Sequence, residues 1–355
     1  MAGGSGERFW PLSRKEHPKQ LLRLTSATET MLHEAVRRIE PVIPRQHIYI
    51  QTMEHLIHPI RKAEVGVPAE NVIAEPCKRN TAGCLIYAVA HLLAKYGTDP
   101  ATLSMAVLTA DHIIGSEELF RKTVVNALGA AEREPLLVTI GVKPTRPATG
   151  YGYIQTAETT ANKPVLTVQA FHEKPDLESA QRYVAAGNYY WNAGMFFWRI
   201  STFLDELRQA QPAMAARTVE LRDALQALDT QRAHQVFQTL ENTSIDYALM
   251  EKARRVAMAP ANFPWDDIGT WAALDRTRQP DTAGNITEGG PVLVECRDCI
   301  VYNAEGADGM SVAVVGADNL VVVVTKDGVL VAPKDRTEDV KKAVQELELR
   351  NARQV

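Results

Sequence analysis

The sequence predicts an α/β fold, in which a Rossmann-like, mostly parallel sheet carries helices on both faces and is followed by a small all-β unit and a terminal helix. Through the first two thirds of the chain, short apolar runs alternate with amphipathic segments of helical period. This alternation is typical of parallel sheets covered by helices. After Pro280, short β runs separated by Gly, Asn and Asp predict the all-β unit.

The expected elements can be placed in chain order. We expect strands at 47–51, 71–74, 103–109 and 136–142, interspersed with helices at 30–39, 55–64, 81–96 and 117–133. A wholly helical block at 200–255 is expected to cover one side of the sheet. We therefore divide the chain into a larger domain at 1–280 and a β-rich domain at 281–355. The strand runs of the second domain fit either a short β-helix-like stack or a small sandwich.

Composition excludes several classes of protein. The formal net charge is -4, with 39 basic and 43 acidic residues interleaved, so no basic field is available to hold nucleic acid. No apolar run approaches the ~20 residues that cross a bilayer, and the N-terminus lacks the order of a signal peptide. We expect a cytoplasmic protein with no nucleic-acid or membrane partner. Cys296 and Cys299 form a C-x-x-C that could be half of a zinc site or a redox pair, but buried thiols are the favoured interpretation.

A glycine-rich segment, Ala2-Gly3-Gly4-Ser5-Gly6, opens the chain. Such a segment lets backbone amides approach phosphate oxygens, and Arg8 and Lys19 would add positive charge. It has neither the G-K-[ST] of a P-loop nor the G-x-G-x-x-G of dinucleotide folds. The glycines alone are equally compatible with a flexible turn, so the prediction of a phosphate loop needs support from elsewhere.

Carboxylates mark a second region of interest. Asp111 follows the predicted strand at 103–109, at the edge where α/β sheets bind ligands, although a cap or turn role is the alternative. Asp266 and Asp267 adjoin a predicted tight turn at Gly269. Mg²⁺ prefers one or two carboxylates together with phosphate oxygens and water. These aspartates are therefore candidate magnesium ligands.

Seven segments, in order along residues 1–340, resemble the motifs of one family, the sugar nucleotidyltransferases, and in particular its mannose-1-phosphate guanylyltransferase branch. The segments are AGGSGERFWPLSR with HPKQL, AEPCKRNTAG, LTADHIIG, TGYGYIQ, FHEKPD, WNAGMFFWR and PWDDIGTW. The resemblance implies Mg²⁺-dependent transfer of a guanylyl group from GTP to mannose 1-phosphate, a single activity without a fused isomerase, and a homodimer. Such a transfer requires in-line attack on the α-phosphorus, helped by a metal and by cations aimed at the developing charge.

The resemblance also assigns residues. It implies that Arg8, Lys19 and Lys174 act on the phosphates, and that Asp267 rather than Asp266 joins Asp111 as a metal ligand. The nucleotide contacts that it implies are Ala2, Gly3, Gly4, Ser5, Gly6, Glu75, Arg79, Asn80 and Thr81. The sugar-phosphate contacts that it implies are Gly150, Tyr151, Gly152, Glu173, Lys174 and Asn192. Two alternatives remain: transfer to another sugar 1-phosphate or from another nucleotide, and a non-catalytic regulator that binds sugar nucleotides.

The start of the chain departs from the family pattern. Relatives place an apolar strand of about half a dozen residues before Ala-Gly-Gly, in the middle of the sheet, whereas Met1 directly precedes Ala2 here. Losing a central strand would remove two ladders of hydrogen bonds, a cost comparable with the ~5–15 kcal/mol stability of a domain. We therefore expect the natural product to be longer. A native N-terminal peptide that begins at Met1 in a folded, active protein would contradict this expectation.

Overall fold

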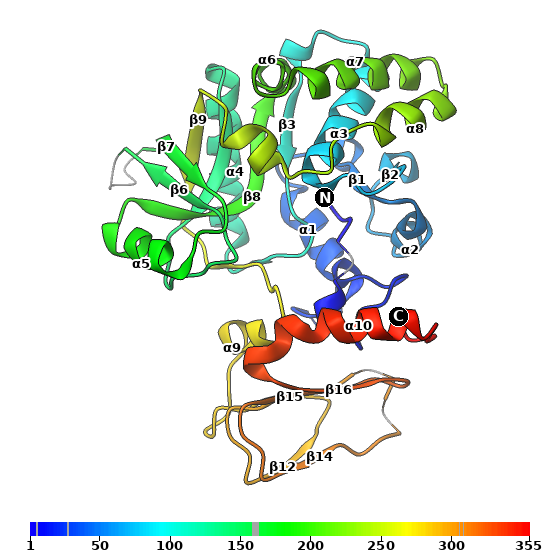
Figure 1. Ribbon diagram of the computed structural model, residues 1–355, viewed down its shortest axis with the longest axis vertical. Helices are drawn as coiled ribbons and strands as arrows, with labels where there is room; N and C mark the ends of the chain where they lie inside the picture. Colours follow the sequence, from blue (N-terminus) through cyan, green and yellow to red (C-terminus); the bar gives the residue numbers. More distant parts are fainter. Residues whose placement is uncertain (5, 27, 158–162, 305, 308) are drawn as a thin grey trace.

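The computed structural model describes residues 1–355 except 5, 27, 158–162, 305 and 308, and places an α/β part next to a smaller β unit (Figure 1). Its α-helices are α1 Met31–Ile39, α2 Ile57–Lys62, α3 Asn80–Tyr96, α4 Glu117–Arg133, α5 Leu177–Ala186, α6 Ile200–Ala210, α7 Pro212–Gln226, α8 Thr230–Gln238, α9 Leu274–Thr277 and α10 Val340–Leu349. The strands of the α/β part are β1 Ile50–Met53, β2 Val72–Glu75, β3 Ser104–Val107, β4 Ile113–Ile114, β5 Leu137–Val142, β6 Tyr153–Thr156, β7 Leu166–His172, β8 Tyr189–Arg199, β9 Val256–Pro260 and β10 Trp265–Asp266. Those of the β unit are β11 Ile286–Glu288, β12 Val292–Val294, β13 Ile300–Asn303, β14 Ala313–Val315, β15 Leu320–Val324 and β16 Val329–Pro333.

The α/β class is confirmed, but the large sheet is mixed and not mostly parallel. Its strands lie in the order β3-β8-β5-β9-β7-β6. Of the pairings within it, β5 with β9 is parallel, while β8 runs antiparallel to β3 and β5, and β7 runs antiparallel to β9 and β6. The prediction of a mostly parallel sheet is wrong because the long strand β8 inserts between β3 and β5. The alternation of helices and strands does not reveal such an insertion.

Helices cover both faces of this sheet, as predicted. Leu137 and Phe196 face the hydrophobic cluster that includes α3, α6 and α7, whereas the next residues along each strand, Val138 and Phe197, face the cluster that includes α4. Side chains that alternate along a strand point to opposite faces, so each strand contributes to two cores. Ser116 caps α4 by accepting a hydrogen bond from the backbone N–H of Leu119, which fixes where that helix begins.

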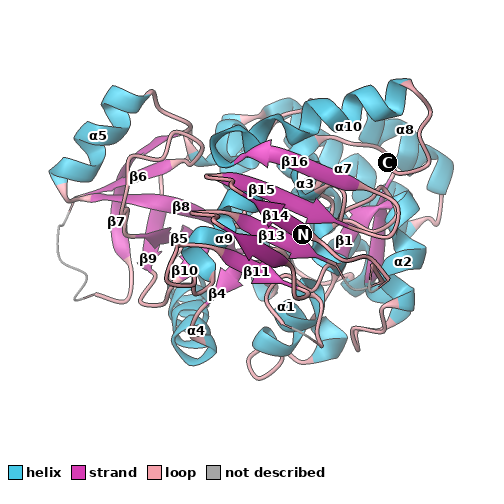
Figure 2. Ribbon diagram, turned by 90° about the horizontal axis from the view of Figure 1, so that it is seen from below, coloured by secondary structure: helices cyan, strands magenta, loops and turns pink. Residues whose placement is uncertain are grey.

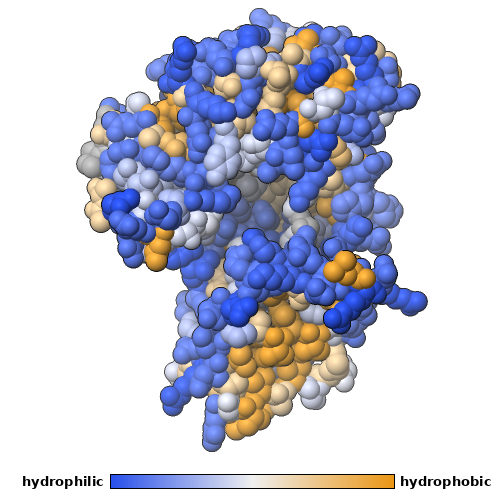
Figure 3. Space-filling view, in the orientation of Figure 1, coloured by the Kyte–Doolittle hydropathy of each residue, from blue (hydrophilic) through white to orange (hydrophobic). Residues whose placement is uncertain are grey.

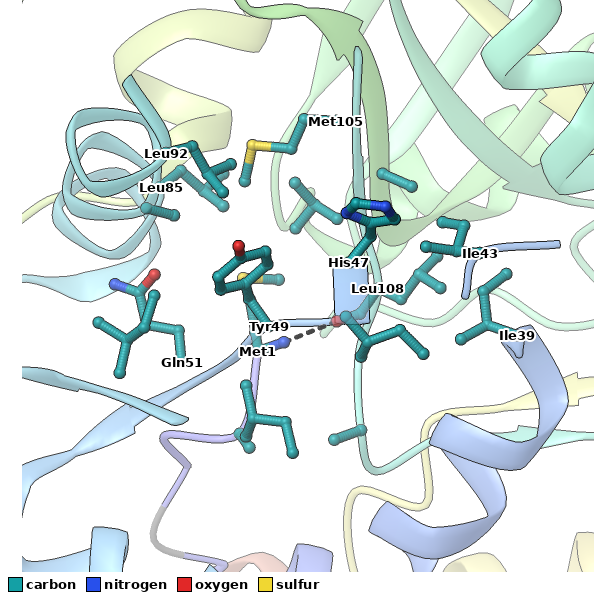
Figure 4. A pocket seen from close by; sticks show the side chains of 18 of the residues that line it. Met1, Ile39, Ile43, His47, Tyr49, Gln51, Leu85, Leu92, Met105 and Leu108 are labelled. Carbon is teal, nitrogen blue, oxygen red and sulfur yellow. Dashed lines mark hydrogen bonds between the residues drawn. The ribbon is translucent and has the colours of Figure 1, made fainter. Parts of the chain in front are cut away.

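The strands β1 and β2 form a separate, parallel two-stranded sheet beside the large one. Between β1 and β3 lies a cavity of about 410 Å³ with a largely apolar lining (Figure 4). Met1 and Ala2 lie at one end of this cavity. The N-terminal residues therefore enter the α/β part between two sheet edges.

The β unit is a short β-helix-like stack and not a sandwich. Strands β11, β13 and β15 pair in parallel, as do β12 and β14 in a second sheet, so successive turns of chain stack on one another (Figure 2). The antiparallel strand β16 closes one edge, and α10 follows it. Cys296 and Cys299 are buried within this stack, which agrees with the interpretation as buried thiols.

Across the described part of the chain, every helix is too short or too polar to cross a membrane.

Candidate active site

Two aspartates from distant parts of the sequence meet around one lysine. Asp111 follows β3, and Asp267 follows β10, which pairs with β4 just beyond Asp111. Lys19 Nζ lies 3.2 Å from Asp111 Oδ2 and donates a hydrogen bond of 2.7 Å to the backbone carbonyl of Asp267. Pairing between β4 and β10 thus brings Asp111 and Asp267 together, and Lys19 contacts both; the sequence analysis assigned all three residues to metal or phosphate binding.

Electrostatics keep Asp111 ionised. Burial disfavours its charge, but the charges of Lys19 and His112 outweigh that effect and hold the pKa of Asp111 below its ordinary value. Burial also lowers the pKa of His112, whose Nδ1 accepts a hydrogen bond of 3.1 Å from Trp265 Nε1. His112 Nε2 lies 3.9 Å from Asp111 Oδ1, and the sequence analysis did not single this histidine out.

The neighbouring carboxylates Asp266 and Asp267 have different partners. Asp266 accepts two hydrogen bonds from Arg276, at 2.6 and 3.0 Å, and one from the backbone N–H of Ile268. Asp267 Oδ1 accepts a hydrogen bond of 2.7 Å from the hydroxyl of Tyr151. The carboxylate of Asp266 is therefore occupied by hydrogen bonds to Arg276 and to the backbone of Ile268. Asp267 is the better candidate for a metal ligand.

Asp111 and Asp267 suit Mg²⁺ by their chemistry. Two carboxylates would leave further coordination positions to phosphate oxygens and water, as this ion prefers. No group of three or more His, Cys, Asp or Glu side chains that could hold a metal occurs among the residues for which coordinates are described. A metal at Asp111 and Asp267 would therefore depend on the substrate to complete its coordination.

The glycine-rich loop packs directly against Lys19. Gly6 has φ 65°, and a Cβ at this position would lie 2.7 Å from Lys19 Cβ, so only glycine is accommodated there without rearrangement. Gln20 Nε2 donates to the carbonyl of Gly4, and Ser13 Oγ donates to that of Gly6. A Cβ added at Gly3 would have no other atom within 4 Å. Ser5 lies outside the described residues. The loop is thus fixed beside the lysine that meets Asp111.

The β unit and the C-terminal segment contact the residues that directly follow this loop. Phe9 is buried in one hydrophobic cluster with Trp271, Tyr302 and Val321. Arg8 forms an ion pair of 2.7 Å with Glu338, which precedes α10. The space-filling view shows a hollow between the α/β part and α10, lined mostly by hydrophilic surface (Figure 3). The structure therefore directs Arg8 toward the C-terminal segment, a contact that the sequence analysis did not foresee.

The residues assigned to the sugar phosphate do come together. Asn192 donates its backbone N–H to the carbonyl of Gly152, and a Cβ at Gly152 would overlap Glu173 Oε2. Lys174 Nζ lies 3.0 Å from Glu173 Oε1, and the carboxylate outweighs burial to raise the pKa of Lys174. The loop at Gly150–Gly152, the strand β8 and the turn after β7 thus form one polar cluster.

This polar cluster contains two residues that the sequence analysis did not assign to any site. Asp246 accepts a hydrogen bond of 2.9 Å from Asn192 Nδ2, and burial together with Glu173 raises the pKa of Asp246 to about 6. Arg146 lies over the rings of Tyr151 and Trp191 and donates to the Tyr151 hydroxyl. An aspartate inside the apolar run IDYALM is an available signal, whereas nothing in the local sequence marks Arg146.

The residues assigned to the nucleotide base occupy the end of β2 and the start of α3. Glu75 is buried, which raises its pKa. Arg79 Nη2 donates to the carbonyl of Gln238, and Thr81 Oγ1 accepts from the backbone N–H of Ile245. Asn80 Oδ1 accepts from the N–H of Thr81. The polar groups of Arg79 and Thr81 therefore hold the helical block against α3, a structural duty that the sequence analysis did not give them.

Comparisons with known proteins identify a family for each part of the chain. Residues 1–283 match the family described as nucleotidyl transferase, and residues 289–347 match the mannose-phosphate isomerase/GMP-like β-helix domain. The chain is 39% identical over 351 residues to the xanthan biosynthesis protein XanB of Xanthomonas campestris pv. campestris (strain B100), covering 98% of this chain and 72% of that one. It is 38% identical over 353 residues to the mannose-1-phosphate guanylyltransferase of Escherichia coli (strain K12), with 98% and 72% coverage.

A solved structure shares the whole architecture. The crystal structure described as mannose-1-phosphate geranyltransferase from Thermus thermophilus superimposes with a TM-score of 0.85 at 34% identity, covering 98% of both chains. The mixed sheet and the β-helix-like stack are therefore shared with an experimentally determined relative.

Proposed function

Because this chain belongs to the nucleotidyl transferase family, we propose that it transfers a guanylyl group from GTP to mannose 1-phosphate, giving GDP-mannose and pyrophosphate. A phosphate oxygen of the sugar phosphate attacks the α-phosphorus of GTP and forms a new P–O bond. The bond between the α-phosphorus and the bridging oxygen breaks, and pyrophosphate leaves on the opposite side. The chemistry needs two anions held together and their developing charge neutralised.

The observation that carries this proposal is the meeting of Asp111, Asp267 and Lys19. Lys19 Nζ contacts both segments, so its charge lies where the carboxylates would hold Mg²⁺ against phosphate oxygens. When bound, Mg²⁺ supplies Lewis-acid stabilisation to the phosphates. The glycine-rich loop next to Lys19 presents backbone N–H groups to the triphosphate. In the structure as it stands, the charge of Lys19 already lies beside this loop, where the triphosphate would bind.

The sugar end of the site is polar and linked to the metal end. Glu173, Asn192 and Asp246 offer acceptors and an amide donor to sugar hydroxyls, and Lys174 offers its charge to the sugar phosphate. Tyr151 connects the two ends because its hydroxyl donates to Asp267 while its loop packs on Glu173 and Asn192. The arrangement supports a sugar 1-phosphate as acceptor. The choice of guanine and mannose rests on the names of the relatives.

A substrate matrix tests this proposal. Pyrophosphate release is measured with GTP, ATP, CTP and UTP against mannose, glucose and galactose 1-phosphates, with saturating Mg²⁺ and again with EDTA. We expect the highest kcat/KM for GTP with mannose 1-phosphate, and none with EDTA. Turnover with only another pair of nucleoside triphosphate and sugar 1-phosphate would show that the substrates are not GTP and mannose 1-phosphate. Binding of GDP-mannose without turnover of any pair would indicate a non-catalytic regulator instead.

A matched pair of variants separates chemistry from folding in this assay. Asp111→Asn removes a proposed metal ligand and should abolish most turnover. Asp99→Asn changes an exposed aspartate that only caps a short turn through the N–H of Ala101, so activity should remain. Full activity of Asp111→Asn would contradict the proposed metal site.

We also propose that two copies associate through the β unit. Hydrophobic surface gathers on this unit in the space-filling view (Figure 3). Exposed valines lie on β12, β14 and β16, including Val292 at 57%, Val315 at 67% and Val331 at 62% exposure. Apolar surface of this kind is typical of contacts between subunits. Sedimentation equilibrium should give a dimer, and Val315→Lys should give a monomer that keeps its fold.

A further inference from the structure

A small polar pocket lies apart from the proposed active site, where α1, β4 and the end of α9 meet. Its volume is about 230 Å³, and its charged lining residues are Glu34, Arg37, Arg38, Glu117 and Arg278. None of the described residues that line it belongs to the proposed active site. The pocket is smaller than the ~300–1,000 Å³ of sites for drug-sized ligands, so it fits a compact ligand and not a nucleotide.

Arg38 is the buried cation of this pocket. It is 6% exposed, and its Nε is buried with no hydrogen-bond partner among the described residues. Its Nη2 lies 3.9 Å from Glu34 Oε2, beyond hydrogen-bonding distance, and that oxygen accepts a hydrogen bond of 2.7 Å from Thr25 Oγ1 instead. Burial lowers the pKa of Arg38, and the carboxylates of Glu34 and Glu117 do not offset this effect. The positive charge of Arg38 is therefore only weakly compensated within the chain.

A ring contact of Arg38 leaves its hydrogen-bonding capacity unused. Arg38 Cζ lies 5.8 Å from the centre of the Phe120 ring, within the range of a cation–π interaction. The ring attracts the charge but offers no oxygen acceptor to the N–H groups of the guanidinium. Leaving a buried charge without hydrogen bonds is costly, and such a group in a native protein is commonly completed by a bound ion or water. An anion in this pocket would satisfy Arg38 directly.

Both other arginines of the pocket are already paired. Arg37 forms ion pairs with Glu29 at 3.0 Å and with Glu117 at 2.8 Å. Arg278, which follows α9, pairs with Glu288 of β11. These pairs hold the walls of the pocket in place, and three arginines against two glutamates leave its lining with one net positive charge. That charge favours an anion over a water molecule as the occupant.

We propose that this pocket binds the phosphate group of a compact anion, either inorganic phosphate or a small phosphomonoester, on the guanidinium of Arg38. A guanidinium donates two parallel hydrogen bonds to two oxygens of one phosphate group. The tetrahedral phosphate then directs its other oxygens toward the further walls of the pocket, where Arg37 and Arg278 lie, whereas a carboxylate has only two oxygens in one plane. Once bound, the anion connects α1 to the segment that leads into the β unit.

Anion titrations test this binding without any assay of catalysis. The full chain, in EDTA and without nucleotide, is titrated with potassium phosphate or glycerol 3-phosphate, and with potassium chloride and potassium acetate at equal ionic strength as controls. We expect at least one of the two phosphates to raise Tm by about 2 °C or more at saturation, and to slow amide hydrogen exchange at 34–38 and 113–117. The phosphate compound with the lower Kd identifies the source of the phosphate group.

Substitution of Arg38 separates an anion site from a purely structural arginine. Arg38→Met keeps a long apolar side chain next to Phe120 but removes the charge, so the response to phosphate should disappear. Without phosphate, the Tm of this variant should equal or exceed that of the unmodified protein, because a buried charge with little compensation is removed. The control variant Arg208→Gln changes an arginine of α6 whose side chain is 65% exposed, and it should alter neither result.

Two more variants locate the bound anion. Glu34→Gln removes a negative charge 3.9 Å from Arg38 and should lower the Kd for phosphate several-fold. Lys19→Gln alters the proposed phosphate loop and should keep the full response, because the pocket does not include that loop. No rise in Tm with either phosphate compound, an equal rise with potassium acetate, or a response that Lys19→Gln loses and Arg38→Met keeps would each overturn the proposal.

Discussion

Replacing Tyr151 by Phe should weaken the proposed metal site while leaving its packing intact. The hydroxyl donates a hydrogen bond of 2.7 Å to Asp267 Oδ1, and the ring packs against Trp191 and Trp265 with centroid distances of 5.1 and 5.6 Å. Burial and the charge of Asp267 raise the pKa of Tyr151, so the phenol stays protonated and donates at every physiological pH. The substitution removes only the donor.

The expected loss follows from the strength of that hydrogen bond. A hydrogen bond to a charged group contributes about 1.5–3 kcal/mol, which corresponds to roughly a 10- to 100-fold loss in magnesium affinity or turnover. The assay is pyrophosphate release as a function of Mg²⁺ concentration, at saturating GTP and mannose 1-phosphate. We expect a higher Mg²⁺ requirement and a lower kcat, with Tm changed by no more than a few degrees.

Tyr153 provides the matched control for this experiment. It lies two residues away on β6, and its hydroxyl is buried without a hydrogen-bond partner among the described residues. Tyr153→Phe should therefore leave both activity and Tm close to those of the unmodified protein. If Tyr151→Phe also stays within twofold of the unmodified protein at limiting and saturating Mg²⁺, the assigned link between Tyr151 and the metal site is wrong.

Four other substitutions have expected outcomes. Asp267→Asn should lower kcat by about 100-fold or more with little change in Tm. Asp266→Asn should mainly lower Tm, because Asp266 binds Arg276. Equal losses of kcat in the two variants would contradict these separate roles. Burial raises the pKa of Asp246 from 3.8 to about 6, so stability falls as pH rises between those values, and Asp246→Asn should gain Tm over the unmodified protein at pH 7 but not at pH 3.5. Phe9→Ala should cost about 3–5 kcal/mol in urea unfolding, and a cost below 1 kcal/mol would show that the loop does not depend on the β unit.

The fold was predictable in those parts where local pattern controls structure. The periodic segments at 81–96 and 117–133 became α3 and α4 within one residue. Strand order and direction were not predictable, since β8 inserts antiparallel between β3 and β5. Pairing direction depends on how the chain returns to the sheet, and an apolar run has the same appearance in either direction.

For the candidate site too, the sequence identified individual residues, whereas the contacts between them depend on the fold. Residue types and spacing along the sequence identified Asp111, the glycine-rich loop and Lys19 as candidates. Asp111 and Asp267 meet because β4 pairs with β10, a contact between residues about 150 positions apart that no local pattern encodes. Asp246 was missed although its single charge inside an apolar helical run is a signal that the sequence offers. The ion pair of Arg8 with Glu338 joins residues 330 positions apart, and no local pattern predicts it.

The sequence by itself determined the α/β class, several of the main helices and the family, because helix periods and short motifs are properties of neighbouring residues. Only the tertiary structure decided how the two neighbouring carboxylates differ, since Asp266 is bound by Arg276 whereas Asp267 accepts a hydrogen bond from the Tyr151 hydroxyl. It also decided what fixes the phosphate loop. Phe9 is anchored in the β unit, and this could not be read from the sequence because packing depends on surfaces that meet only after the chain has folded.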